Sequence, residues 1–146
     1  MAISYYTEDV KRPKLRYRNV TAWLKKVIDK FDFTAGDLSY IFCDDEYLKK
    51  VNTKYLKHDF YTDIVTFDYC SGKIVSGDMF ISLDRVNENA GIFQCNATDE
   101  LLRVIVHGLL HLFGYTDSSD SEKETMRRLE DECVFMFKEM ENECIK

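Results

Sequence analysis

Proline, paired cysteines and long apolar runs are scarce in this sequence. Pro13 is the only proline. The cysteines are odd in number, widely spaced and without a C-x-x-C pair: Cys43, Cys70, Cys95, Cys133 and Cys144. This pattern argues against a disulfide framework or a cysteine-based zinc site, so we expect free thiols. No apolar run approaches the ~20 residues of a membrane span, and Met1–Thr7 lacks the apolar segment of a signal peptide. These absences predict a cytoplasmic protein without a membrane partner.

Positive charge is not in excess either. The formal net charge is −6, whereas nucleic-acid-binding proteins usually carry more Lys and Arg than Asp and Glu. The charge is unevenly distributed, because acidic residues gather in the last quarter of the chain. A basic run near the start contains Lys11, Arg12, Lys14, Arg16 and Arg18. Two interpretations of this run stay open: a solvated surface segment, or one basic face on an otherwise acidic protein.

Length and patterning predict one α+β domain over residues 1–146. Alternating apolar residues indicate strands at Ala2–Thr7 (an edge strand), Asp37–Cys43, Ile64–Tyr69 and Lys73–Leu83, with a hairpin turn at Ser71-Gly72. Helical spacing indicates helices at Ala22–Phe31 (capped by Asn19 or Thr21), after Asp44 or Asp45, at Asp84–Phe93, at Leu101–Phe113 (capped around Thr98) and at Ser121–Asn142. We expect Gly36 to break the first helix and Gly77 to mark a bulge or a close approach of two chains. The expected architecture is a small mixed sheet packed with helices.

The predicted helix Leu101–Phe113 is almost entirely apolar, which is typical of a helix in the middle of a fold. It carries His107 and His111, which at spacing i,i+4 lie on one helix face and can converge on one ion. Gly114 allows a sharp turn after the helix, so that Asp117 can return as a third ligand. Two histidines that only fill a core are the alternative, but burying both without a common purpose is costly. Three ligands leave a fourth position for water, which is the arrangement of a catalytic zinc site.

The spacing also resembles the metalloprotease pattern H-E-x-x-H, in which a glutamate follows the first histidine and serves as general base. Gly108 occupies that position here and can neither accept a proton nor polarise water. A metalloprotease is therefore disfavoured.

Three segments resemble the YbeY family of metal-dependent endoribonucleases. The segment His107–Tyr115 is similar to the family's H-G-x-L-H-L-x-G-Y. Asn52–Phe67 resembles N-x-x-Y-R-x-x-D-x-x-T-D-V-L-S-F, and Gly77–Ser82 resembles G-D-I-x-I-S. The likeness runs from about residue 37 to residue 132 in the family's order.

The resemblance implies an α+β fold and one zinc ion per chain, with other divalent ions as alternatives. It also implies a single-stranded RNA substrate, and roles in ribosomal RNA processing (the 16S 3′ end) and ribosome quality control. The ribosome or ribosomal proteins are implied as partners.

Two departures from the family pattern are visible. Asp117 stands where the family usually has a third histidine, and Thr116 stands where it usually has an aspartate, so the ligand position falls on Asp117. We expect a carboxylate there to make the metal acidify water less and to tolerate harder ions better. Leu56 replaces an arginine that the family is thought to use in catalysis or phosphate binding. Lys57 and His58 lie beside it and are the candidate catalytic residues, although lysine cannot reproduce bidentate phosphate recognition.

Other polar residues allow more than one interpretation. His58 is either an acid–base or phosphate-binding residue or an exposed loop histidine. Asp59, Thr62 and Asp63 are typical of a turn before a strand, and Asp78 is either a support of a metal histidine or a structural carboxylate. Two rival functions stay open: another metal hydrolase acting on peptides or small esters, and a ribosome-assembly factor whose metal is structural.

Overall fold

A four-stranded mixed sheet forms the centre of the computed structural model, which describes residues 2–56 and 62–145. The strands are β1 (Ile3–Thr7), β2 (Thr34–Cys43), β3 (Ile64–Asp68) and β4 (Ile74–Ser82). Their spatial order is β1-β2-β4-β3, with β3 antiparallel to β4 and the other pairs parallel. The expected α+β class, the edge position of the first strand and the mixed sheet are therefore confirmed.

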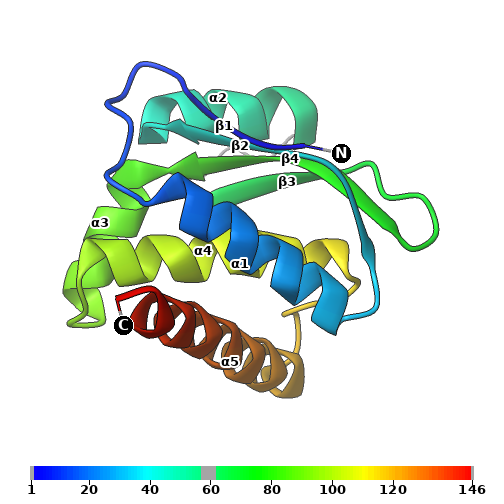
Figure 1. Ribbon diagram of the computed structural model, residues 1–146. Coiled ribbons are helices and arrows are strands. Elements are labelled where there is room, and N and C mark those ends of the chain that lie inside the picture. Colours follow the sequence, from blue (N-terminus) through cyan, green and yellow to red (C-terminus); the bar gives the residue numbers. More distant parts are fainter. Residues whose placement is uncertain (1, 57–61, 146) are drawn as a thin grey trace.

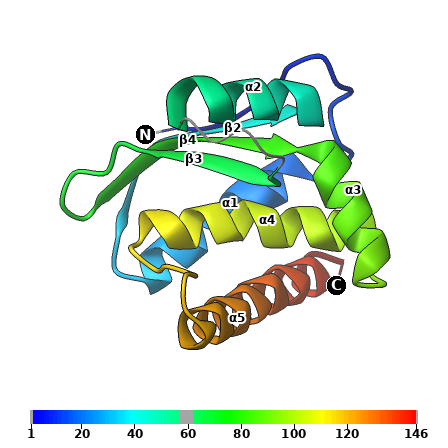
Figure 2. The same cartoon turned by 180° about the vertical axis from the view of Figure 1, so that it is seen from behind.

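Five helices in the described residues pack in layers around the sheet: α1 (Tyr17–Lys30), α2 (Asp45–Leu56), α3 (Leu83–Ile92), α4 (Ala97–Leu112) and α5 (Asp120–Ile145). Helix α2 covers one face of the sheet, and α1 and α4 lie under the other (Figures 1 and 2). Helix α5 packs beneath α4 and α1, so α4 lies between the sheet and α5. This central position explains why α4 is apolar almost all round.

Helix α1 begins earlier than its sequence predicts. It starts at Tyr17 after Arg16, which makes no capping bond with its side chain. The expected cap Thr21 lies within the helix, and its hydroxyl is 2.9 Å from the Tyr5 hydroxyl of β1. Packing of an apolar face that includes Trp23 and Val27, both fully buried, therefore overrides the local capping preference.

Gly36 is part of a strand and does not end helix α1, contrary to expectation. The helix ends at Lys30, and Gly36 lies in β2 at a register shift opposite β4. A Cβ atom at Gly36 would lie 2.1 Å from the Ser76 Oγ atom, so the close approach of β4 requires glycine. The close approach expected at Gly77 is confirmed, because a Cβ atom there would lie 2.5 Å from the carbonyl oxygen of Phe67.

The hairpin and the remaining helices follow the predictions within a few residues. Ser71 and Ile74 close the turn through reciprocal backbone hydrogen bonds, with Gly72 at φ +57°. Asp44 caps α2, since its carboxylate accepts a bond from the Tyr47 N–H group. Helix α4 starts at Ala97, and its cap is Asn96, not Thr98: the Asn96 side chain accepts from the Asp99 N–H group at 2.7 Å.

Candidate metal centre

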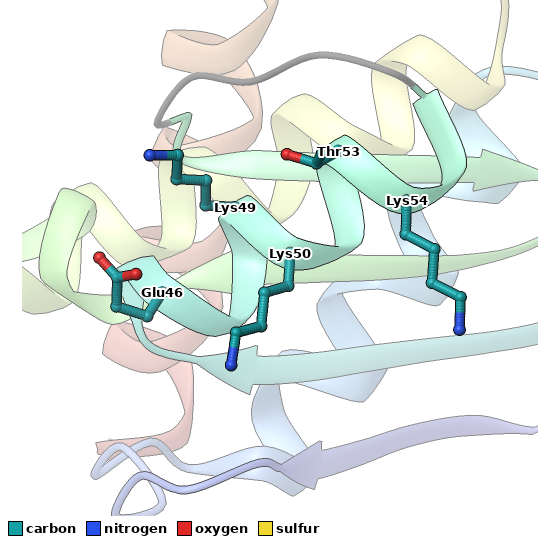
Figure 3. A pocket seen from close by; sticks show the side chains of 5 residues that line it. All are labelled: Glu46, Lys49, Lys50, Thr53 and Lys54. Atoms are coloured by element: carbon teal, nitrogen blue, oxygen red, sulfur yellow. The ribbon is translucent and has the colours of Figure 1, made fainter.

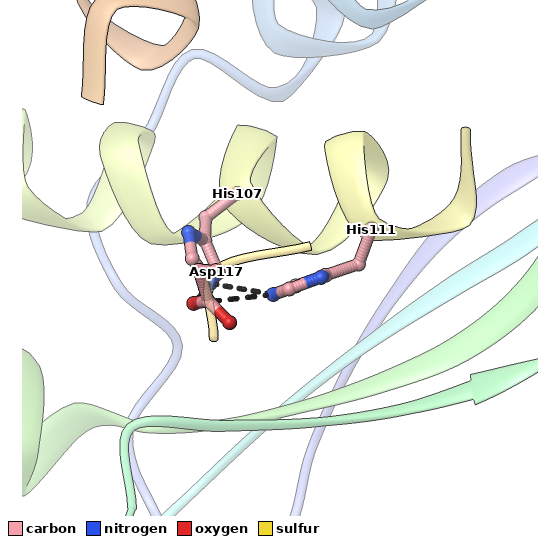
Figure 4. Close-up of side chains that lie close together, drawn as sticks. All are labelled: His107, His111 and Asp117. Atoms are coloured by element: carbon pink, nitrogen blue, oxygen red, sulfur yellow. Dashed lines mark hydrogen bonds and ion pairs between the residues drawn. The ribbon is translucent and has the colours of Figure 1, made fainter. Parts of the chain in front are cut away.

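His107 and His111 project from one face of α4, one helical turn apart (Figure 4). Their Nε2 atoms lie 2.9 Å from each other, and the two rings are nearly perpendicular at 85°. The Asp117 Oδ2 atom lies 3.5 Å from the His107 Nε2 atom and 3.6 Å from that of His111. The three predicted ligands therefore converge, and they form the single group of potential metal ligands among the described residues.

A glycine turn brings Asp117 back to the helix. Gly114 has a φ of +105°, which side-chain-bearing residues rarely adopt. Its N–H group bonds to the His111 carbonyl, and the Tyr115 N–H group bonds to the Leu110 carbonyl. These two bonds form a Schellman motif, which ends α4 and reverses the chain. Beyond the turn, the Thr116 hydroxyl and the Ser119 N–H group both donate to the Glu122 carboxylate at the start of α5.

His107 is fixed by a buried carboxylate from α5. Its Nδ1 atom lies 2.5 Å from the Glu130 Oε2 atom, and the other Glu130 oxygen accepts a bond from the Arg103 guanidinium at 3.0 Å. Arg103 also donates to Asp131 at 2.6 Å. The Glu130 side chain is only 7% exposed, whereas that of Asp131 is 59% exposed. The buried Glu130 carboxylate thus accepts hydrogen bonds from both the Arg103 guanidinium and the His107 imidazole.

His111 is fixed by the backbone. Its Nδ1 atom lies 2.9 Å from the Tyr115 carbonyl oxygen, which can only accept a hydrogen bond. Both histidines therefore carry a proton on Nδ1, and each ring in its neutral form presents the lone pair of Nε2 to the same point. The Asp117 carboxylate adds a third acceptor there. When both rings are neutral, three electron pairs face one another with no hydrogen between them, so this set of ligand atoms fits a cation at its centre.

The separations of the ligand atoms fit a small divalent ion. A tetrahedral ion with bonds of about 2.0–2.2 Å separates its ligand atoms by about 3.3–3.6 Å. Both histidine–Asp117 separations, 3.5 and 3.6 Å, lie in that range. The 2.9 Å between the two Nε2 atoms is shorter by about half an ångström. The two histidine–Asp117 separations thus fit such an ion, and the two Nε2 atoms lie closer together than it requires.

Opposing influences act on the pKa of His107. Burial lowers it, but the hydrogen bond that His107 donates to Glu130 and the negative charges of Glu130, Asp63 and Asp117 raise it by more, so that the pKa lies above its ordinary value. Asp63, which directly precedes β3, belongs to the same electrostatic environment. Its burial raises the pKa of its carboxyl, and the nearby His107 offsets part of that rise.

One side of the centre faces solvent. The Asp117 side chain is 43% exposed, in contrast to 20% for His107. The opposite side is closed by the sheet, because a Cβ atom at Gly108 would lie 2.7 Å from the Ile64 Cδ1 atom and 2.9 Å from the Met79 Sδ atom. A glutamate there would have to displace the Ile64 and Met79 side chains. The absence of a protease-type general base thus has a packing reason as well as a chemical one.

Asp78 does not support the metal histidines, contrary to one of its two interpretations. Gly77 and Met79 face α4, since their neighbours are Leu112 and Gly108. Asp78 alternates to the other face of β4, where Phe80 stacks on Tyr47 of α2. Its side chain interacts with Tyr69, so the supporting role falls to Glu130.

The tentative catalytic residues Lys57 and His58 lie outside the described residues, as does Asp59. Leu56 is the last residue of α2, on the face of the sheet opposite α4. Sequence reasoning missed Glu130 and the Tyr115 carbonyl. A signal for Glu130 existed, because it is four residues after Met126 and seven before Phe137, both buried on the inner face of α5.

None of the helices in the described part of the chain combines the length and apolar character that a bilayer crossing requires. Cys43, Cys70, Cys95 and Cys133 are free thiols, as expected.

Comparisons with known proteins agree with the three sequence segments. The family model described as endoribonuclease YbeY matches residues 3–138. A Bacteroides thetaiotaomicron protein named endoribonuclease YbeY is 48% identical over 136 residues, covering 93% of this chain and 99% of the relative. A Parabacteroides distasonis protein of the same name is 46% identical over 139 residues, covering 95% and 98%.

A solved structure supports the same fold. The solution structure of a Thermotoga maritima protein superposes with a TM-score of 0.67 at 24% sequence identity, covering 94% of this chain and 93% of the other. At this identity the likeness concerns the fold alone. The match of the family model over nearly the whole chain, together with relatives of nearly 50% identity, shows that the chain belongs to the endoribonuclease YbeY family.

Proposed function

We propose that this protein is a metal-dependent endoribonuclease that cleaves single-stranded RNA, with ribosomal RNA as its substrate. Membership of the YbeY family supports the reaction class. The observation that carries the proposal is the convergence of three lone-pair donors, His107, His111 and Asp117, at a solvent-facing position. A site that serves only structure is usually closed by a fourth protein ligand.

A bound divalent ion supplies Lewis acidity, which polarises a phosphoryl oxygen and makes water a better nucleophile at neutral pH. The residues of this chain would hold the ion and orient its ligand atoms. His107 and His111 present their Nε2 atoms, because Glu130 and the Tyr115 carbonyl occupy the Nδ1 protons. Asp117 contributes the exposed ligand, so an RNA phosphate approaches from its side.

Zinc is the proposed ion. Two imidazole nitrogens, one carboxylate oxygen and separations close to tetrahedral suit zinc better than calcium or magnesium, which prefer six or more oxygen ligands. The carboxylate makes this set harder than three histidines. We therefore propose zinc with manganese as the strongest competitor.

Maturation of ribosomal RNA and ribosome quality control in the cytoplasm are part of the proposal. The family resemblance supports the substrate, and the free thiols fit a reducing compartment. Single-stranded RNA is favoured because its bases and backbone are accessible to a site on a protein surface.

The rival function is a metal-stabilised ribosome-assembly factor without cleavage. Leu56 favours it, because the family's arginine is missing at the end of α2. The exposed Asp117 and the solvent-facing side of the centre favour the enzyme, since a structural ion gains nothing from access to water.

Cleavage of a ribosomal RNA fragment at defined metal occupancy tests the proposal. We expect cleavage by the zinc-loaded protein, none by His111→Ala, and faster cleavage by Leu56→Arg. One metal per chain with no cleavage by either the parent protein or Leu56→Arg would contradict the nuclease and favour the assembly factor. A peptide and ester panel, expected to be inert, excludes the other metal hydrolases.

A further inference from the structure

Among the described residues, helix α2 covers only the β3–β4 half of the sheet face on which it lies. Helix α2 packs against β3 and β4. A row of side chains crosses all four strands on this face, since the register aligns Tyr6, Ile41, Phe80 and Val65. Val65 is only 3% exposed, Ile41 and Phe80 are half-buried, and Tyr6 is 54% exposed. The row therefore emerges from under α2 and ends as an open apolar surface on edge strand β1.

A hollow of about 510 Å³ lies on this open half of the sheet. Its apolar and aromatic lining includes Tyr6, Ile41, Tyr47 and Phe80, and its charged lining is Arg12 and Glu8. Arg12 belongs to the basic run of the connector between β1 and α1, and its guanidinium lies 4.0 Å from the centre of the Tyr17 ring. We call this hollow the open-face groove.

The flank of α2 beside the groove is basic. Lys50 and Lys54 follow Tyr47 by three and seven residues, so they lie on the same side of the helix as that ring. Figure 3 shows both lysines pointing to the side of β2, whereas Lys49 points to the opposite side of α2. A second hollow of about 450 Å³ over this helix is bordered by the three lysines, Thr53 and Glu46. Lys50 and Lys54 thus add positive charge on the helix flank next to the groove, whereas the charges that act on Tyr47 itself are those of Glu8 and Asp9.

Aromatic rings next to lysine and arginine are the chemistry that binds single-stranded nucleic acid. Bases stack on the rings, and cations track the phosphates. An apolar peptide would use the rings but has no need of the lysines. We propose that the open-face groove is a second surface for single-stranded RNA, in which bases stack on Tyr6 and Tyr47 while Arg12, Lys50 and Lys54 contact phosphates. This inference rests on the proposed function, because it assigns a further contact to the same RNA substrate.

The two sites lie far apart on the molecule. The metal centre lies on the α4 face beside the start of β3, and the groove lies on the opposite face beside β1. Because β1 and β3 are the two edges of the sheet, one RNA strand must pass around the sheet to reach both sites. The groove therefore affects the binding of long substrates and leaves the cleavage step of short ones unchanged.

Two kinds of variant separate stacking from charge. Tyr6→Ala removes the exposed ring, and the double variant Lys50→Glu/Lys54→Glu reverses the charge on the flank of α2. Their matched controls are Phe135→Ala on α5, where the ring is 64% exposed, and Lys25→Glu on the exposed side of α1. All five substitutions in these four variants concern exposed side chains, so thermal unfolding is expected to match that of the parent protein.

Fluorescence anisotropy with non-cleavable 2′-O-methyl oligouridylates of about 4 to 30 nucleotides, on the zinc-loaded protein at several salt concentrations, gives the readout. Tyr6→Ala is expected to raise the Kd for long oligonucleotides about five- to tenfold without changing the salt dependence. The lysine double variant is expected to reduce the slope of log K against log salt by about 1.4. Phe135→Ala and Lys25→Glu are expected to stay within about twofold of the parent protein.

Parent-like affinity and slope in both groove variants would overturn the inference. That result is separate from failure of the proposed function, which is judged by metal-dependent cleavage of short RNA. If the parent protein cleaves short RNA and the groove variants bind long RNA as the parent does, the proposed function stands and the proposed RNA-binding role of the groove is wrong. If His111→Ala abolishes binding of long RNA as completely as it abolishes cleavage, the groove is likewise not a binding surface.

Discussion

The two halves of the metal centre are held in different ways. The helical half, His107, is anchored by Glu130, which is buried between α4 and α5 and bonded to Arg103. The loop half, Asp117, depends on the turn at Gly114 and on hydrogen bonds to Glu122 at the exposed start of α5. His111 links the two halves, because it belongs to α4 but bonds to the Tyr115 carbonyl of the loop.

This difference indicates a division of labour. A buried network fixes His107, whereas an exposed turn leaves Asp117 accessible to solvent. Disturbing the buried half should cost both stability and metal affinity. Disturbing the loop half should lower the metal affinity more than the free energy of unfolding.

Glu130→Ala should have the largest effect. It leaves the His107 Nδ1–H group and the Arg103 guanidinium without a buried acceptor, which costs about 3–5 kcal/mol of unfolding free energy and about 10- to 100-fold in metal affinity. Urea unfolding and zinc titration measure the two losses. Asp131→Ala is the matched control, because Asp131 binds the same arginine but is exposed. Equal effects of the two variants would contradict the role of the buried half.

Gly114→Ala should come next. Alanine at a φ of +105° is strained, and the change should cost about 1–2 kcal/mol. Zinc affinity should fall with it, because the turn places Tyr115 and Asp117. Gly91→Ala in α3 has open space around it and should stabilise the protein by about 0.5–1 kcal/mol. A parent-like zinc affinity of Gly114→Ala would show that the turn does not position the ligand.

Asp117→His should have a smaller effect, on which metal binds and not on whether one binds. The variant keeps three ligands but loses a negative charge, so its selectivity for zinc over manganese should rise. Competition between the two ions, measured by mass spectrometry of the intact protein, gives the ratio. An unchanged ratio of bound zinc to bound manganese would show that the carboxylate does not determine the metal preference.

The smallest effect should be a dependence on pH of the stability of the loop that carries Asp117. Donation from the Thr116 hydroxyl and the Ser119 N–H group lowers the pKa of Glu122 below its ordinary value of 4.5. A lowered carboxyl pKa adds stability that is complete above about pH 4.5 and is lost as the pH falls through the lowered pKa. The Ser119 amide signal in NMR spectra should follow this titration, and Glu122→Gln should abolish it. A Ser119 signal that titrates equally in both proteins would contradict the assignment.

The convergence of His107, His111 and Asp117 was predictable from the sequence because their relation is local. His107 and His111 are one helical turn apart, and Gly114 and Asp117 follow within a few residues. Glu130 was not predicted, because its contact with His107 depends on how α5 docks against α4, 23 residues further along the chain. Long-range docking of this kind leaves only an indirect trace, a charged residue on a buried helix face.

The fold shows the same contrast. The strands and the hairpin were predicted because alternation and turn residues are local signals. The start of α1 and the role of Gly36 were not, because burial of the helix face with Trp23 and Val27 decides the first and the close approach of Ser76 decides the second. The open-face groove was also beyond sequence reasoning, since it arises from the register of four strands and the part of the face that α2 leaves uncovered.

The central claim is that His107 and His111 bind one ion through Nε2 while their Nδ1 protons stay hydrogen-bonded. Long-range 1H–15N NMR spectra of the imidazoles, recorded while zinc is added to metal-free protein, test it most directly. We predict that one equivalent of zinc shifts the Nε2 signals of both residues, that both Nδ1 atoms remain protonated, and that His58 is unaffected. Zinc bound through Nδ1, or no change at either residue, would contradict the account.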